Sequence, residues 1–421
     1  MVDLFLPAAP ATEALLADEC AALLGPRALV RAQRGGVNVR GGPREAMLLN
    51  LHSRLAQRVL WPLAAGGYRD EHDLYDLART VDWSGWITPR HSLRVDVTAQ
   101  RSPLRSLHFA ALRIKDGVCD DQRDRLGARP DVNTRDPDLP LLLHLGPEQA
   151  TLYADLSGEA LFKRGWRDGP GAKGEAPLKE TLAAAMLAAA GWRGRAEDGP
   201  LLDPCCGAGT IAIEAAQLAC GIAPGLNRRF AFERLLPFQG WSADWQQLRE
   251  AALAARHAPA VPVFAGDVSF RMTDFAGRNA QRAGVADAIA FKTADALQRP
   301  PPVAAGTMLL NPPYGERIEP GGTAPSRQAA GPSVEGDDFF GALAAHFKRH
   351  YAGWTAWILS PDAGLAGRMR LKPSRRVPLW NGTIECRMYR FDLVAGRHGR
   401  HADAADAGDP APPDGAASDP T

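Results

Sequence analysis

The chain has 421 residues, of which 45% are hydrophobic and 23% are charged, and its formal net charge is +1. This composition is typical of a globular protein with about two or three domains, and it excludes a chain that is disordered throughout. The net charge gives no sign of nucleic-acid binding by itself, although local basic surfaces are compatible with it.

The cysteines and the apolar runs narrow the type of protein further. The six cysteines are scattered without a C-x-x-C pair, so the sequence predicts neither a disulfide scaffold nor a zinc site. No stretch approaches about 20 uninterrupted apolar residues, and the N-terminus does not resemble a signal peptide. We therefore expect a monomeric cytoplasmic protein that binds no metal and does not enter a membrane.

The first 156 residues show two successive units in which strand and helix patterns alternate. Residues 1–60 have the order β-α-β-β-α, which predicts a small ferredoxin-like domain, and Gly35-Gly36 favours a hairpin turn within it. Residues 61–156 form a second α+β unit. Its expected helices and strands lie, in chain order, at 74–81, 93–98, 104–124, 139–145 and 151–156.

Basic side chains gather in the second unit and in the Gly- and Pro-rich linker that follows it at residues 157–177. They are compatible with a surface that contacts the phosphates of a nucleic acid, although a solvated helix face would carry the same residues. The candidate contacts are Arg101, Lys115, Arg129, Arg164 and Arg167.

From residue 178 onward the pattern changes to a regular alternation of strands and helices. Such a sequence predicts a Rossmann-like α/β domain with a mostly parallel sheet, here at residues 178–396. A stretch rich in Gly, Pro, Ala and Ser at 319–336 is expected to be a mobile loop, and the tail at 397–421 is expected to be disordered.

The first strand of this domain leads into a glycine-rich turn and then a helix. The candidate ligand-binding residues of the turn are Asp203, Pro204, Cys206, Gly207, Gly209 and Thr210. Its glycines let a ligand approach the backbone, and the helix start offers free N–H groups. The spacing excludes a triphosphate P-loop, whereas a dinucleotide site and an ordinary strand-to-helix turn both remain possible readings of this motif.

Two further acidic residues follow later strands of the same domain. Asp267 comes directly after an apolar strand, where a carboxylate typically accepts hydrogen bonds from ribose hydroxyls. Asp295 follows the next strand and could accept from the amine of an adenine, or it could simply cap a helix. Since ligands of such domains bind at the carboxyl ends of the strands, these acids predict a nucleoside pocket there.

The candidate catalytic motif is Asn311-Pro312-Pro313-Tyr314, which follows the apolar run Met308–Leu310. The prolines stiffen the turn and remove backbone donors, so that the Asn311 side-chain oxygen and the Pro312 carbonyl become fixed acceptors for a planar amino group. Tyr314 can stack on the ring that carries the amine. An ordinary turn would also tolerate Asn-Pro-Pro, but the preceding buried strand favours a site.

Taken together, these motifs resemble class I S-adenosylmethionine-dependent methyltransferases that act on amino nitrogens. Further stretches are similar to the RlmL-like family of bacterial 23S rRNA guanine-N2 methyltransferases. These stretches include 35–37, 53–56, 73–75, 129–133, 162–167, 176–185, 223–228 and 311–317, so the resemblance covers nearly the whole chain up to about residue 394.

The resemblance implies a ferredoxin-like domain, a THUMP RNA-binding domain and a Rossmann-like catalytic domain in that order. It implies transfer of a methyl group from S-adenosylmethionine to the exocyclic N2 amine of a guanosine in 23S rRNA, either free or in an assembling large ribosomal subunit. In this chain Ser269 replaces an acidic or Asn residue of the family, and Cys205-Cys206 replaces Met-Cys. A second methyltransferase domain, fused in many bacteria, is expected to be absent.

Two other functions remain open at this stage. The same catalytic motif serves methylation of adenine N6 or of a protein glutamine amide. A non-catalytic RNA-binding protein that assists ribosome assembly is the alternative from another class, and the complete set of cofactor residues argues against it.

Overall fold

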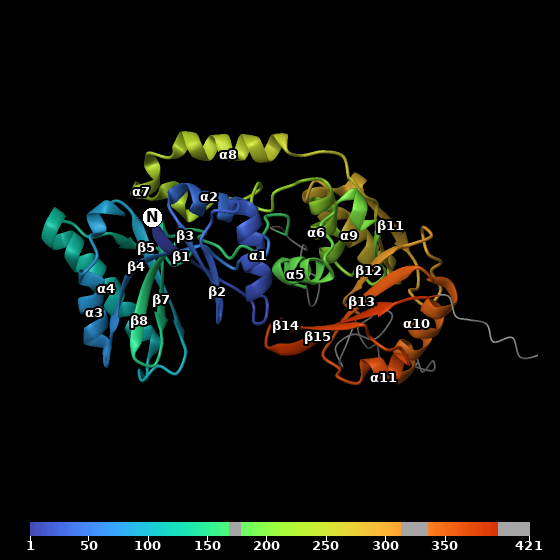
Figure 1. The fold of residues 1–421 in the computed structure, drawn as a ribbon. Coiled ribbons are helices and arrows are strands. Elements are labelled where there is room, and N and C mark those ends of the chain that lie inside the picture. The colour runs from blue at the N-terminus through green and yellow to red at the C-terminus, as the bar shows by residue number, and fades with distance from the viewer. Residues whose placement is uncertain (168–177, 313–335, 395–421) are drawn as a thin grey trace, which may run out of the picture.

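The computed structural model describes residues 1–167, 178–312 and 336–394, which form two lobes, each built on one sheet (Figure 1). In the described part of the chain, no helix has the length and apolar character needed to cross a membrane. The tail predicted at 397–421, the second half of the linker and the loop predicted at 319–336, except its last residue, lie outside the described residues; that last residue, Gly336, begins a helix.

The first lobe combines the two N-terminal units in a single eight-stranded sheet of order β2-β3-β1-β4-β8-β7-β5-β6. Its strands are β1 (Val2–Pro7), β2 (Val30–Gln33), β3 (Gly36–Gly41), β4 (Leu60–Gly67), β5 (Ser92–Ala99), β6 (Asp131–Val132), β7 (Leu139–Leu145) and β8 (Gln149–Asp155). Its helices are α1 (Glu13–Leu24), α2 (Pro43–His52), α3 (Glu71–Arg79) and α4 (Leu107–Leu126). Strand β4, which the sequence pattern did not predict, joins the units by pairing with both β1 and β8.

The second lobe is an α/β domain whose seven-stranded sheet has the order β11-β10-β9-β12-β13-β15-β14. Strands β9 to β13 are parallel, and β15 is antiparallel to both of its neighbours. The strands are β9 (Leu201–Asp203), β10 (Val263–Asp267), β11 (Ile289–Thr293), β12 (Gly306–Leu310), β13 (Trp354–Ser360), β14 (Arg375–Asn381) and β15 (Ile384–Asp392). This confirms the prediction of a Rossmann-like, mostly parallel sheet.

Helices cover both faces of the second sheet and alternate with its parallel strands. They are α5 (Glu180–Ala190), α6 (Thr210–Ala219), α9 (Phe270–Arg282), α10 (Gly336–His350) and α11 (Leu365–Met369). Helices α7 (Leu236–Gln239) and α8 (Ser242–Ala254) follow α6 in the chain but lie away from this sheet, toward the first lobe (Figure 1). Alternate residues of the central strands enter two apolar cores: Leu309 and Leu359 pack on the α5 and α6 side, whereas Leu310 and Ile358 pack on the α10 side. Both faces of these strands are therefore buried, as expected of a parallel sheet.

The two lobes are in direct contact along α2 and α8. Helix α8 runs beside α2 and connects the lobes across the upper edge of the view (Figure 1). Below it, the Gly225 N–H donates to the Leu51 carbonyl over 2.9 Å. A Cβ atom at Gly225 would lie 2.8 Å from that carbonyl oxygen, so the close approach of the lobes requires glycine here.

Candidate active site

The glycine-rich turn after β9 is fixed by backbone hydrogen bonds. Cys206 N–H donates to the Gly266 carbonyl, and Gly209 N–H donates to the Cys206 carbonyl, both over 2.7 Å. Gly207 and Gly209 have φ angles of +51° and +84°, which are in the left-handed region that favours glycine. A Cβ at Gly209 would also lie 3.0 Å from the Ala276 Cβ on α9. The turn thus brings the start of α6 close to α9.

Asp203 ends β9 beneath this turn and is almost completely buried. Its carboxylate accepts one hydrogen bond, from the Cys205 N–H over 3.3 Å. Burial, the largest cause, and the nearby charge of Asp267 raise the pKa of Asp203, whereas the Cys205 hydrogen bond and the charge of Arg299 lower it; the net result is a pKa of about 8. The buried carboxyl of Asp203 is therefore a weaker acid than an ordinary aspartate side chain.

Asp267 closes the turn from the neighbouring strand. One of its carboxylate oxygens accepts from the Gly207 N–H and the other from the Ser269 N–H, each over 3.0 Å. Each oxygen has a second lone pair, so the carboxylate can still accept hydrogen bonds from a ligand. The next residue, Val268, is 55% exposed, which leaves an apolar side chain beside Asp267. The sequence analysis had not identified Val268.

Asp295 lies near the same turn. Burial is the main cause that raises the pKa of the Cys205 thiol, and the nearby charges of Asp203, Asp267 and Asp295 raise it as well. Its carboxylate also accepts from the Leu297 N–H over 2.9 Å and from the Gln298 side chain over 3.4 Å. Asp295 therefore caps the turn that follows β11, as in the alternative interpretation, while it remains at the carboxyl edge of the sheet.

Asn311 follows the last residue of β12, which lies next to β9 in the sheet. The Oδ1 atom of Asn311 is buried and has no hydrogen-bond partner in the part of the chain that the structure describes. An unpaired buried acceptor costs free energy, roughly 1–3 kcal/mol, unless a ligand supplies a donor. Pro312 is buried beside it, whereas Pro313 and Tyr314 lie outside the described residues.

Within the described residues, a second buried polar atom without a partner belongs to the Arg299 guanidinium, which lies against Gly266 of β10. Arg299 is 4% exposed, and its Nη1 atom has no hydrogen-bond partner among the described residues. A side chain at Gly266 would collide with that nitrogen, so the approach requires glycine. The positive charge of Arg299 lowers the pKa of Asp203 and so partly offsets the effect of burial. No motif surrounds Arg299, which is why sequence analysis missed it.

The start of α6 is held by buried ion pairs, and this finding corrects one prediction. Arg164 is 2% exposed, and its Nε donates over 3.0 Å to Glu214, which is fully buried on α6. Its remaining donors reach the carbonyls of Leu161 and Arg54. The prediction that Arg164 contacts RNA is therefore wrong, because its guanidinium is enclosed in the protein.

Arg167 is also largely buried, with its side chain 11% exposed. It pairs with Glu180 over 3.2 Å and donates to the Thr210 hydroxyl and to the Leu178 carbonyl. These contacts hold the first residue of α6, so the structure favours a supporting role for Arg167 over direct RNA contact.

The other candidate RNA contacts lie on the surface of the first lobe. Arg101 and Arg129 are exposed, and Lys115 is half-buried beside Asp116, with 2.6 Å between the charged atoms. Arg101 adopts a φ of +56°. The structure brings none of these residues to the glycine-rich turn, and their contact with RNA stays a prediction.

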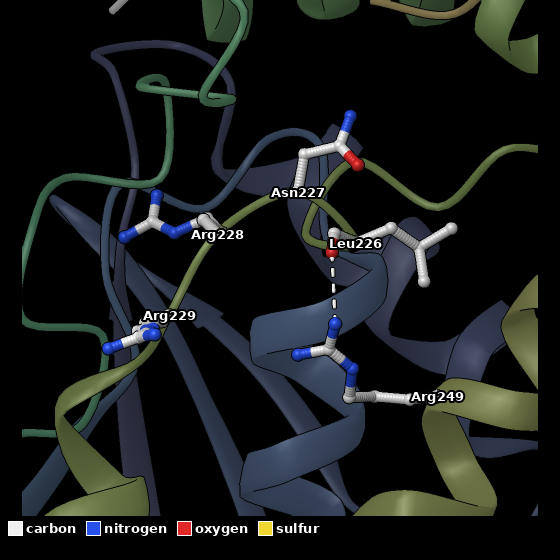
Figure 2. Close-up of a pocket in the computed structure, with 5 residues that line it drawn as sticks. All are labelled: Leu226, Asn227, Arg228, Arg229 and Arg249. Carbon is white, nitrogen blue, oxygen red and sulfur yellow. Dashed lines mark hydrogen bonds between the residues drawn. The ribbon is translucent and has the colours of Figure 1, made fainter.

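A separate hollow lies where the linker meets the catalytic lobe (Figure 2). It is lined by Leu226, Asn227, Arg228, Arg229 and Arg249. Arg228 donates to the carbonyls of four linker residues between Ser157 and Lys163, and Arg249 donates to the Leu226 carbonyl. This hollow shares no residue with the predicted pocket, and its half-buried Arg228 holds the linker against the catalytic lobe. No group of three potential metal ligands occurs in the described ranges.

Comparisons with known proteins agree with this architecture. Residues 164–390 match the family model described as RMKL-like, methyltransferase domain; residues 68–155 match the THUMP domain, and residues 3–60 match the RlmL ferredoxin-like domain. A ribosomal RNA large subunit methyltransferase K/L from Shewanella amazonensis is 38% identical over 87% of this chain and 50% of the relative. The relative of that name from Syntrophotalea carbinolica is 36% identical over 94% of this chain and 54% of the relative. The chain thus spans about half the length of these relatives.

Solved structures show the same arrangement of lobes. The crystal structure of SMU.472 complexed with SAH has a TM-score of 0.80 and 25% identity, and covers 94% of this chain and 99% of that chain. The structure of a predicted N6-adenine-specific DNA methylase from Listeria monocytogenes has a TM-score of 0.78 and 25% identity, and covers 93% of this chain and 96% of that chain.

Proposed function

Because the chain belongs to the family of RMKL-like methyltransferase domains, we propose that it transfers a methyl group from S-adenosylmethionine to the exocyclic N2 amine of a guanosine in 23S rRNA. The observation that carries this proposal is the buried Oδ1 of Asn311 at the carboxyl edge of the sheet, which has no hydrogen-bond partner among the described residues. An amino group of a base would supply the donor that this oxygen lacks. The names of the rRNA methyltransferase relatives support RNA as the substrate.

The residues of the pocket fit S-adenosylmethionine. Asp267 retains acceptor capacity for ribose hydroxyls, and the exposed Val268 can pack against the adenine. The free N–H groups at the start of α6 and the Asp203 carboxyl would hold the methionine part. When bound, the cofactor supplies an electrophilic methyl group on a sulfonium.

The contribution of the protein is mainly to position the amine. Asn311 accepts one hydrogen of the amine, and Pro312 provides a rigid backbone carbonyl for the other. Both acceptors favour pyramidal character at the nitrogen and hold its lone pair in one direction. The base must leave its stack to reach this site, which costs a few kcal/mol. Stacking on Tyr314 would offset part of that cost.

Methylation of adenine N6 is the second candidate. It shares the Asn-Pro-Pro-Tyr motif, and one structural neighbour is named as an N6-adenine-specific DNA methylase. The THUMP match favours RNA over DNA as the substrate. A non-catalytic assembly factor is the third candidate, and the complete set of expected cofactor residues argues against it.

The test is mass spectrometry of nucleosides from unmodified 23S rRNA after incubation of the purified chain with S-adenosylmethionine. We expect one N2-methylguanosine with the wild type and none with Asn311→Ala. A matching loss of one N2-methylguanosine is expected in 23S rRNA from a deletion strain. Formation of N6-methyladenosine would select the second candidate, and RNA binding without any methylated product would select the third.

A further inference from the structure

The hairpin formed by β14 and β15 lies at one margin of the catalytic sheet and extends past its active-site edge (Figure 1). Leu310 at the end of β12 is level with Ile358, which is opposite Tyr389 on β15. Strand β15 continues four residues beyond this level, to Glu385. At about 3.3 Å per residue, the hairpin reaches roughly 13 Å past the end of β12.

One face of this projecting hairpin carries cations around an aromatic ring. The register places Arg376 opposite Tyr389, Pro378 opposite Arg387 and Trp380 opposite Glu385, so these pairs point to the same side. Arg376 and Arg387 are exposed, and Trp380 is half-buried. The Arg376 guanidinium lies over the Tyr389 ring at 5.9 Å. We call the residues Arg376, Trp380 and Arg387 the hairpin face.

These cations are poorly neutralised by the protein. Arg376 forms no ion pair within the described residues, and Arg387 is 3.9 Å from Glu385 with both side chains about half exposed. Residues 362–392 contain seven basic residues (Lys and Arg) and three acidic residues (Asp and Glu). The whole chain has 49 basic and 48 acidic residues. The surplus positive charge of this segment therefore exceeds that of the entire chain.

Protection of an edge strand against aggregation is the simplest other explanation, since charges and proline serve it. That role does not require a partly exposed tryptophan, and Trp380 packs in neither apolar core of the described chain. Positive charge combined with an accessible aromatic ring is typical of surfaces that bind single-stranded nucleic acid. At about 4.8 Å between strands, β15 lies roughly 10 Å to the side of β12, close to Asn311.

We propose that the hairpin face binds the unpaired RNA segment beside the target nucleotide, with Trp380 stacked on a base and both arginines on phosphates. This inference rests on the proposed function, because it takes RNA as the substrate. It explains how a nucleotide can be held outside its stack: its neighbours are bound at the same edge of the sheet. The THUMP lobe then acts on more distant parts of the RNA.

The test compares RNA binding of two double variants over a range of salt concentrations, with an unmodified 23S rRNA transcript as the probe. Arg376→Gln/Arg387→Gln removes the hairpin cations. Arg193→Gln/Arg349→Gln removes two exposed arginines at the opposite, amino edge of the sheet and is the matched control. We expect the hairpin variant to lower the slope of log K against log salt by about 1.4–2, and the control to leave it unchanged.

A charge-preserving variant and two ring variants separate RNA binding from edge protection. Arg376→Lys/Arg387→Lys should keep most of the slope. Trp380→Ala should weaken RNA binding by roughly tenfold, and Trp380→Phe should restore most of it, since stacking needs a ring. Affinity for S-adenosylhomocysteine, measured by calorimetry, should stay at the wild-type value in all variants, which shows that they are folded.

The outcomes distinguish this inference from the proposed function. If the wild type methylates 23S rRNA and the hairpin variants bind it with wild-type slope and affinity, the inference is overturned and the function stands. If the control variant loses as much RNA affinity and salt slope as the hairpin variant, the effect comes from total charge, and the inference also fails. If the wild type neither binds nor methylates RNA, the proposed function itself is wrong.

Discussion

Glu214 offers the sharpest test of how the structure is held together, and we predict that Glu214→Gln strongly destabilises the protein. The side chain is fully buried on α6, four residues after Thr210. One oxygen accepts from Arg164 Nε over 3.0 Å, and the other accepts from Arg54 Nη1 over 2.9 Å. Arg54 follows α2 in the first lobe, and Arg164 lies in the segment that connects the lobes, so this carboxylate joins the two lobes.

The expected magnitude follows from the charges that the substitution leaves behind. Glutamine has the same shape but no charge, so two buried guanidinium groups lose their counter-ion. Removing one partner of a buried ion pair costs about 3–5 kcal/mol. A lobe of this size loses about 2–4 °C of Tm per kcal/mol, so the melting temperature should fall by on the order of 10 °C.

The control is Glu197→Gln, which removes a comparable ion pair at the surface. Glu197 and Arg195 are 3.1 Å apart, and both side chains are more than half exposed. Exposed pairs contribute about 0–1 kcal/mol, so this variant should melt within about 3 °C of the wild type. Thermal unfolding followed by circular dichroism measures both variants. Equal melting temperatures for Glu214→Gln and the wild type would refute the reasoning.

The same variant should also change the pH dependence of stability. Burial raises the pKa of Glu214, but the charges and hydrogen bonds of Arg164 and Arg54 outweigh it and hold the pKa below its usual value. The folded chain then binds fewer protons at this site than the unfolded chain. The stabilisation is therefore present above the unfolded pKa near 4.5 and is lost as the pH falls through the folded pKa. The stability of Glu214→Gln should therefore not show this decline at low pH.

Three further predictions concern the pocket and the first lobe. Asn311→Ala should lower kcat by roughly 100- to 1000-fold while S-adenosylhomocysteine affinity measured by calorimetry stays within about twofold; wild-type turnover would exclude the assigned role. Asp203, whose pKa is raised to about 8, binds a proton in the folded chain that the unfolded chain releases near its own pKa, so stability should decline from about pH 4 to pH 8. Melting curves of Asp203→Asn should lack that decline, and an unchanged pH profile would contradict the shift. Lys115→Ala/Arg129→Ala should weaken RNA binding and lower the slope of log K against log salt by about 1–2. Unchanged binding at low salt would remove both residues from the RNA contact surface.

The residues of the glycine-rich turn could be predicted because their signals are local. A strand, two glycines with positive φ and a helix start are adjacent in the chain, and Asp203 and Asp267 end neighbouring strands. The register of a parallel sheet brings such strand ends together without any further information. The same reasoning placed Asn311 at this edge.

Arg164 and Arg299 could not be assigned from sequence because their surroundings come from distant segments. Arg164 looks like one more basic residue of a linker, and only the fold places it against Glu214, 50 residues later. Arg299 has no motif, and its position under Gly266 depends on the turn after β11. Net charge and local composition cannot separate a buried ion pair from a surface that binds RNA.

The buried ion pairs also constrain how the proposed reaction can proceed. Thr210 and Glu214 lie one turn apart on α6; Thr210 contacts Arg167, and Glu214 pairs with Arg164 and with Arg54 of the first lobe. The glycine-rich turn that precedes Thr210 therefore cannot shift relative to the first lobe unless these buried pairs separate, which would cost several kcal/mol. Closure of one lobe onto the other is thus an expensive way to align RNA with the cofactor. Extrusion of a single base, which costs a few kcal/mol, leaves these ion pairs intact, and it requires a surface at the sheet edge that holds the neighbouring nucleotides.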